Sequence, residues 1–119
     1  MASLVHTCDR EMWARAVSSE GGVISTNVLA CYRESASNES AAVVRSGENV
    51  RDFLRLAEVF RKRYPGFSRD RARQIAAHAA LRQARRFSDL NDHDSAQSNW
   101  RLWTENCSWL DRLKEGLRP

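Results

Sequence analysis

Apolar residues recur at three- and four-residue steps over most of the chain, which is the spacing of amphipathic helices. A first short helix is predicted over residues 9–19, with Asp9 as its N-cap and an apolar stripe that ends before Gly21 and Gly22. A longer helix is predicted over 47–64 and stops at Pro65. Its apolar face comprises Val50, Phe53, Leu54, Ala57, Phe60 and Tyr64.

Two more helices follow, joined by a short polar turn. The helix over 68–90 has Ser68 as N-cap, and its inward face is mostly small: Ala72, Ile75, Ala76 and Ala79, then Phe87. The helix over 94–115 has Asp92 or Asp94 as N-cap. Its apolar seam comprises Ala96, Trp100, Trp103, Cys107, Leu110 and Leu117. The pair resembles one tetratricopeptide-like hairpin, whereas such arrays need about three repeats to stand alone.

The segment between the first two predicted helices breaks the helical period. Residues 22–32 are rich in β-branched side chains and predict one short strand or two, and the polar residues 34–40 predict a loop. The expected fold is therefore mainly α, with a short β segment followed by a three-helix bundle or a helical hairpin. Two regions are expected, 1–46 and 47–119.

Composition places the chain among ordinary globular domains. Its 119 residues are 42% hydrophobic and 29% charged, which excludes collagen-like and wholly disordered classes. No apolar run reaches the length of a membrane span, and the first ten residues lack the pattern of a secretory signal. We therefore expect a cytoplasmic protein, with at most a peripheral contact at the inner face of a membrane.

Cysteine and histidine are few and scattered. Three cysteines without a C-x-x-C pair favour reduced thiols over a disulfide scaffold or a zinc site. The three histidines show no metal-ligand spacing. No metal site and no resident cofactor are expected in this chain.

Positive charge is concentrated in the second half of the chain. Residues 61–86 hold nine basic residues and a single acid, Asp70, and 17 of the 19 basic residues are arginine. On helices, Arg69, Arg73, Arg82 and Arg86 could form one positive face near Arg61 and Arg63. Three interpretations remain open: a solvated helix face, a surface for anionic lipid or lipid-linked phosphate, and a nucleic-acid surface. The lack of interleaved aromatic residues disfavours nucleic acid.

A chain of short motifs in the first half resembles the family 2 glycosyltransferases, which are inverting nucleotide-sugar enzymes of the GT-A type. The segment C-D-R-E-M-W-A-R-A, residues 8–16, is similar to the family's E-D-x-E-L-W-x-R pattern. Residues 22–33 are similar to its G-x-v-x…x-L-A-x-Y-R strand, and Asn38 to Ser40 to the following N-x-S. The likeness covers about residues 5–64.

The resemblance implies roles for individual residues. Asp9 matches the catalytic base that deprotonates the acceptor hydroxyl, and Glu11 and Trp13 match positions that shape the acceptor side of the pocket. Arg33 matches the arginine near the nucleotide diphosphate. Asn38 and Ser40 match the substrate-side N-x-S.

Other positions depart from the family pattern. Cys8 and Ser35 replace the first acid and a histidine that holds a divalent metal in some members. The single D-x-D, Asp92 to Asp94, lies in an expected helix–helix turn.

The family's nucleotide-binding half has no counterpart before Asp9. The resemblance therefore implies the C-terminal part of a glycosyltransferase that is inactive alone. Nucleotide sugar, a hydroxyl acceptor and Mg²⁺ or Mn²⁺ would belong to the intact enzyme. The alternative function is a small helical interaction module that uses its arginine face. Trp100 and Trp103 are expected in the core or a helix interface, and an exposed tryptophan helix could form a homodimer.

Overall fold

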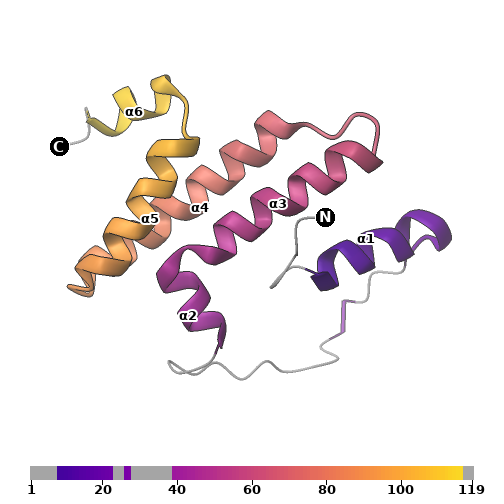
Figure 1. Cartoon of the computed structure of the whole chain (residues 1–119), viewed down its shortest axis with the longest axis horizontal. Coiled ribbons are helices and arrows are strands. Elements are labelled where there is room, and N and C mark those ends of the chain that lie inside the picture. Colours follow the sequence, from indigo (N-terminus) through magenta and orange to yellow (C-terminus); the bar gives the residue numbers. More distant parts are fainter. Residues whose placement is uncertain (1–7, 23–25, 28–38, 117–119) are drawn as a thin grey trace.

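The computed structural model describes residues 8–22, 26–27 and 39–116 (Figure 1). Over these residues the protein is mainly helical. The helices are α1 (Cys8–Glu20), α2 (Glu39–Ser46), α3 (Glu48–Arg63), α4 (Arg69–Asp89), α5 (His93–Asn106) and α6 (Trp109–Gly116). This confirms the predicted helical class. None of the described helices is long and apolar enough to span a membrane.

The predicted β segment is not seen. Within residues 22–32 the structure describes Gly22, Thr26 and Asn27, and none of them is in a strand. The rest of that segment, and residues 34–38 of the predicted loop, lie outside the described residues. The loop prediction was wrong at its end, because Glu39 and Ser40 already form the first turn of α2.

Local signals set the ends of α3 and α4 close to where they were predicted. The Ser68 hydroxyl accepts a hydrogen bond from the Arg71 backbone N–H at 3.2 Å, which satisfies one of the free N–H groups at the start of α4. Gly66 takes the positive φ of 86° that the turn after α3 requires. The helix predicted over 47–64 is therefore α3, and that over 68–90 is α4.

The helix predicted over 94–115 is two helices. Asp92 caps α5, its carboxylate accepting from the Ser95 N–H at 3.3 Å, and α5 ends at Asn106 because Cys107 is extended. Ser108 then starts α6: its hydroxyl accepts from the Asp111 N–H at 3.2 Å and donates to the Asp111 carboxylate at 2.8 Å. Ser108 and Asp111 form an S-x-x-D pattern, which is typical of a helix N-terminus and could have indicated a break inside the predicted helix.

The core lies where α3, α4 and α5 meet (Figure 1). The α4–α5 pair has the most extensive contact, because α4 presents small side chains and a helix can approach them closely. Buried core residues are Val50, Ala76, Ala77, Ala80, Leu81, Leu102 and Trp103. The predicted helical hairpin is thus confirmed as a packed pair.

Two predicted core positions on these helices were wrong. Ile75 is 53% exposed and Trp100 is 45% exposed, whereas Leu56 and Leu102 are buried at 3% each. The periodic pattern allowed neighbouring stripes on each helix, and packing selected one of them. Leu117 of the predicted seam lies outside the described residues.

A tight junction joins α2 to the bundle. Gly47, between α2 and α3, has φ 74°, and a Cβ built there would lie 2.3 Å from Leu102 Cδ1. The fully buried Asn99 donates through its amide nitrogen to the carbonyls of Val44 and Arg45, each at 3.1 Å. The last-turn carbonyls of α2 are therefore held by a side chain of α5.

Candidate functional site

The residues matched to the glycosyltransferase base and acceptor side lie on α1. Asp9 is the second residue of this helix rather than its N-cap, because α1 begins at Cys8. Its carboxylate accepts from the Arg10 N–H at 2.8 Å and is exposed. Trp13 is 62% exposed and lies four positions further on, so Asp9 and Trp13 share one face of the helix. An open carboxylate and an open indole therefore lie one turn apart.

Glu11 has a different environment from Asp9 and Trp13. Its carboxylate pairs with Arg15 at 3.1 Å on the same helix and with Arg63 at 3.3 Å at the end of α3. The side chain is only 16% exposed. Glu11 is thus a link between α1 and α3, and its described contacts tie it to the protein rather than leave it open to a ligand.

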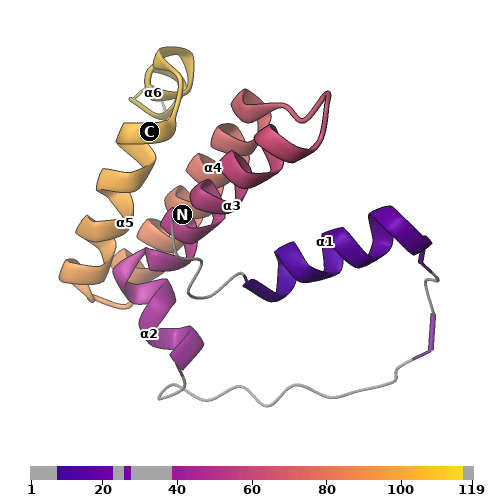
Figure 2. The same cartoon turned by 45° about the vertical axis from the view of Figure 1, so that its right-hand side comes forward.

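The helix α1 lies beside the bundle rather than in it (Figures 1 and 2). Its apolar residues Met12, Trp13 and Val17 are 48%, 62% and 53% exposed. An isolated helix of this length is marginal in water, and most helical stability comes from burying an apolar face. The described part of the chain does not provide that burial for α1.

Of the remaining residues implied by the resemblance, the structure describes Ser40. Arg33, Asn38 and Ser35 lie outside the described residues. Ser40 is exposed near the start of α2. Within the described ranges there is no group of three or more His, Cys, Asp or Glu side chains that could hold a metal ion.

The predicted arginine face is divided between two sides of α4. Each residue rotates the helix by about 100°, so the nine positions from Arg73 to Arg82 make two full turns and about half a turn more. Arg69 and Arg73 therefore face one side, and Arg82 and Arg86 face the other. The prediction of one continuous positive face was wrong, because the nine-residue step between Arg73 and Arg82 places the two arginine pairs on opposite sides of the helix.

Arg69 and Arg73 line a cleft between α3 and α4 with a volume of about 370 Å³. Two further arginines, Arg51 and Arg55, reach the cleft from α3, together with Glu58. On each helix the two arginines are four positions apart and share a face. The cleft thus combines two arginine pairs with one lining carboxylate. The α3 pair was not among the arginines that the sequence pattern indicated.

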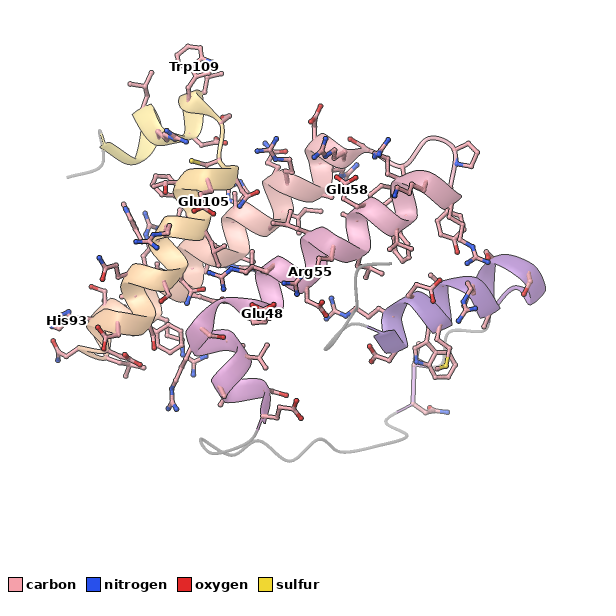
Figure 3. The ribbon with its side chains drawn as sticks, in the orientation of Figure 1. Glu48, Arg55, Glu58, His93, Glu105 and Trp109 are labelled. Carbon is pink, nitrogen blue, oxygen red and sulfur yellow. The ribbon has the colours of Figure 1, made fainter. Side chains whose placement is uncertain are left out.

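Carboxylates outside and inside the cleft position its arginines (Figure 3). Arg55 Nη1 lies 2.6 Å from Glu48 Oε1 and 3.4 Å from the buried Asp52 carboxylate, and Arg51 Nη1 lies 3.4 Å from Glu48 Oε2. The hydrogen bond to Glu48 raises the pKa of Arg55 above its ordinary value. These contacts hold both α3 arginines in preferred positions.

Glu58 is the carboxylate inside the cleft. It pairs with Arg69 at 2.6 Å and with Arg61 at 3.1 Å. The hydrogen bond from Arg61 lowers the pKa of Glu58, and the charges of Arg69 and Lys62 act in the same direction. Glu58 is therefore ionised near neutral pH and neutralises part of the positive charge of the cleft.

Arg73 differs from the other three arginines of the cleft. Its Nη2 donates to the Glu105 backbone carbonyl near the end of α5, at 3.3 Å. Among the described residues, no ion pair joins Arg73 to a carboxylate within 4.0 Å. Its guanidinium contributes positive charge that the described residues do not neutralise directly.

The tryptophans divide between the core and the surface. Trp103 is 6% exposed, which confirms its predicted place in the core, and its ring lies 4.7 Å from that of the exposed Trp100. On α6, Trp109 is 68% exposed, and Figure 3 shows it pointing away from the bundle. Leu110 and Leu113 are exposed on the same short helix at 49% and 54%, so the prediction of Leu110 as part of the apolar seam was wrong. Exposed apolar surface is thus present at both ends of the described chain.

The D-x-D segment has a structural role. Asp92 caps α5 and lies 4.0 Å from the Arg45 guanidinium, so it joins the α4–α5 turn to α2. Hydrogen bonds from Ser95 lower the pKa of Asp92. The segment therefore lies at the helix–helix turn where the sequence predicted it.

No protein-family model matches this sequence, and the searches of curated proteins and of solved structures returned no significant match either.

Proposed function

We propose that this chain is the C-terminal part of an inverting family 2 glycosyltransferase. The proposal is supported by the order of the motifs in residues 8–40 and is carried by one geometric observation: Asp9 and Trp13 lie exposed on the same face of α1. A carboxylate and an aromatic ring are the groups that bind a sugar-like acceptor, the carboxylate at a hydroxyl and the ring against an apolar face.

In this proposal Asp9 acts as the general base. Its carboxylate accepts the proton of the acceptor hydroxyl, and the acceptor oxygen forms a bond to the anomeric carbon. The bond from that carbon to the diphosphate oxygen breaks, so the nucleoside diphosphate leaves with the bonding electrons. Arg33 is assigned to the diphosphate side, and Glu11 to holding α1 against Arg63.

The uncovered apolar stripe of α1 supports the same proposal. Met12, Trp13 and Val17 require a surface that the described part of the chain does not supply. In the proposed enzyme, the nucleotide-binding half provides this surface and also the metal and donor sites. This chain alone is therefore proposed not to turn over.

The test is Asp9→Asn in the longest natural protein that contains this chain, with Asp94→Asn as the matched control in the first turn of α5. Loss of a general base lowers the rate by about 10²–10⁴-fold. We expect that loss in sugar transfer for Asp9→Asn and near-normal transfer for Asp94→Asn. Normal transfer by Asp9→Asn would refute the assignment of the base.

A second measurement tests the isolated 119-residue chain. Calorimetric titration with a nucleotide sugar and Mn²⁺ uses Arg69→Gln/Arg73→Gln, which lacks two of the cleft arginines, so that phosphate binding in the cleft does not contribute. It is expected to give no binding heat, because the donor side belongs to the other half of the enzyme. Tight binding would contradict the proposal that this chain is only the acceptor-side part.

The second candidate function is a helical interaction module with an anionic partner. The four-arginine cleft between α3 and α4 favours it. The proposed partners are the phosphates of anionic lipid at a membrane surface, and a second copy of this chain through the exposed α6 residues around Trp109. Loss of function on changing cleft arginines, with Asp9→Asn silent, would favour the module over the enzyme.

A further inference from the structure

We propose that the cleft between α3 and α4 is a binding site for a compact phosphate-bearing anion of about the size of a diphosphate. The inference does not rest on the glycosyltransferase proposal, because no α1 residue lines the cleft. It rests on the placement of Arg51, Arg55, Arg69 and Arg73 around one volume.

The charge balance of the cleft favours an anion. Four guanidinium groups and one carboxylate, that of Glu58, line it. The carboxylates of Glu48 and Asp52 also pair with the α3 arginines, so the excess charge comes mainly from Arg73, which has no carboxylate partner among the described residues. Arginine presents a planar set of N–H donors that matches phosphate oxygens in a bidentate manner. Two such pairs on two neighbouring helices provide donors from opposite walls, so two linked phosphates are a better match than one.

Most of these arginines are held in place before any ligand arrives. Glu48 contacts both Arg51 and Arg55, and the Glu105 carbonyl accepts from Arg73. Holding a side chain in advance reduces the entropy that binding must overcome. Arg51 and Arg55 line the cleft, whereas Glu48, the carboxylate that holds them both, does not.

Glu58 occupies the position of a competing anion. Its carboxylate lies 2.6 Å from Arg69 and 3.1 Å from Arg61, and it is ionised near neutral pH. A phosphate that enters the cleft takes over Arg69 from Glu58. Removing the charge of Glu58 should therefore strengthen anion binding, a result that a purely structural ion pair would not give.

The size and lining of the cleft narrow the ligand class. Its volume of about 370 Å³ is at the small end of ligand pockets. None of the lining residues is aromatic, so the cleft offers no platform on which a nucleobase could stack. The cleft is therefore proposed to bind phosphate groups rather than bases. These phosphates could belong to a free diphosphate or to a lipid headgroup.

The test compares two double variants on the same helix. Arg69→Gln/Arg73→Gln removes two charges from the cleft, and Arg82→Gln/Arg86→Gln removes two charges with the same spacing from the opposite side of α4. All four side chains are exposed, so both variants are expected to fold, which far-ultraviolet circular dichroism checks. Binding of inorganic pyrophosphate is measured by calorimetry at an ionic strength of about 0.1 M, where charges more than ~10 Å apart are screened.

We expect the cleft variant to weaken pyrophosphate binding by at least about tenfold, or ~1.4 kcal/mol, and the control variant by less than about twofold. Glu58→Gln is expected to tighten binding. Equal weakening by both double variants would show diffuse charge rather than a site and would overturn the proposal, as would weaker binding by Glu58→Gln.

A second arm identifies the source of the phosphate. Co-sedimentation is measured with phosphatidylcholine vesicles that contain or lack phosphatidylglycerol. The site is supported, with a headgroup as its ligand, if the chain binds only vesicles with the anionic lipid and does not bind pyrophosphate. The cleft variant must then bind these vesicles more weakly than the control variant does. If the unmodified chain binds neither pyrophosphate nor anionic vesicles, the proposal is wrong. Asp9→Asn is expected to bind both probes normally, so failure of the enzyme proposal would be seen separately.

Discussion

Replacing Gly47 by alanine should destabilise the protein more than any other glycine-to-alanine change in the described chain. Gly47 lies between α2 and α3 with φ 74°, a conformation that L residues adopt at a cost of about 1–2 kcal/mol. A Cβ at this position would lie 2.3 Å from Leu102 Cδ1. Leu102 is only 3% exposed, so it cannot move aside freely.

The expected magnitude has two parts. Backbone strain contributes about 1–2 kcal/mol, and forcing an extra methyl group into a packed core typically costs about 1–3 kcal/mol. The sum is about 2–5 kcal/mol, against a total stability of about 5–15 kcal/mol for a typical domain. Gly47→Ala should therefore remain folded in water but unfold at clearly lower denaturant concentration.

Gly66→Ala is the matched control, because it isolates the backbone part. Gly66 also has positive φ, 86°, but a Cβ there would meet no atom within 4 Å. Urea unfolding is followed by circular dichroism and by the fluorescence of the tryptophans, of which Trp103 is buried. We expect Gly47→Ala to lose about 1–3 kcal/mol more than Gly66→Ala. Equal losses would refute the clash with Leu102.

A double-mutant cycle tests the same contact directly. Leu102→Ala removes the Cδ1 atom that the new methyl group would meet. In that background, Gly47→Ala should cost only as much as Gly66→Ala, which gives a coupling of about 1–3 kcal/mol between the two positions. Additive effects would show that the strain at Gly47 has another origin.

Three further predictions concern caps and buried polar contacts. Asn99→Ala removes the donor for the α2 carbonyls and should lower the unfolding free energy by about 1–3 kcal/mol in urea titration; no change would contradict the role of this amide. Ser68→Ala should cost about 0.5–2 kcal/mol by loss of the bond from Arg71, whereas Ser68→Asp should restore most of it. Hydrogen bonds from Ser95 lower the pKa of Asp92, so its contribution is present above the unfolded pKa and is lost as the pH falls through the lower folded pKa. Between pH 7 and pH 3 the urea midpoint of the unmodified chain should therefore fall more than that of Asp92→Asn, and identical falls would contradict this assignment.

The helices of the bundle were readable from local patterns. Ser68, Pro65 and Gly66 mark the ends of α3 and α4, and Asp92 marks the start of α5, because caps and turns depend on a few neighbouring residues. The break between α5 and α6 was missed although Ser108 and Asp111 form a cap there. A continuous apolar period across that break outweighed the cap in the prediction.

The candidate sites were predicted less completely than the helices. The sequence singled out Arg69 and Arg73, but it grouped them with Arg82 and Arg86 on one face. The two arginines of α3 that line the same cleft, Arg51 and Arg55, were not recognised as part of a site. A cleft between two helices depends on which faces meet, and a periodic pattern on one helix does not specify its neighbour.

Local sequence determined that this protein is helical and where most of its helices begin and end, since those choices depend on contacts within a few residues. Tertiary structure alone decided which stripe of each helix is buried: Leu102 rather than Trp100, and Ala80 rather than Ile75. It also decided that Gly47 must lack a side chain and that four arginines from two helices surround one cleft. The physical reason is that close packing selects among alternatives that have nearly equal local free energy.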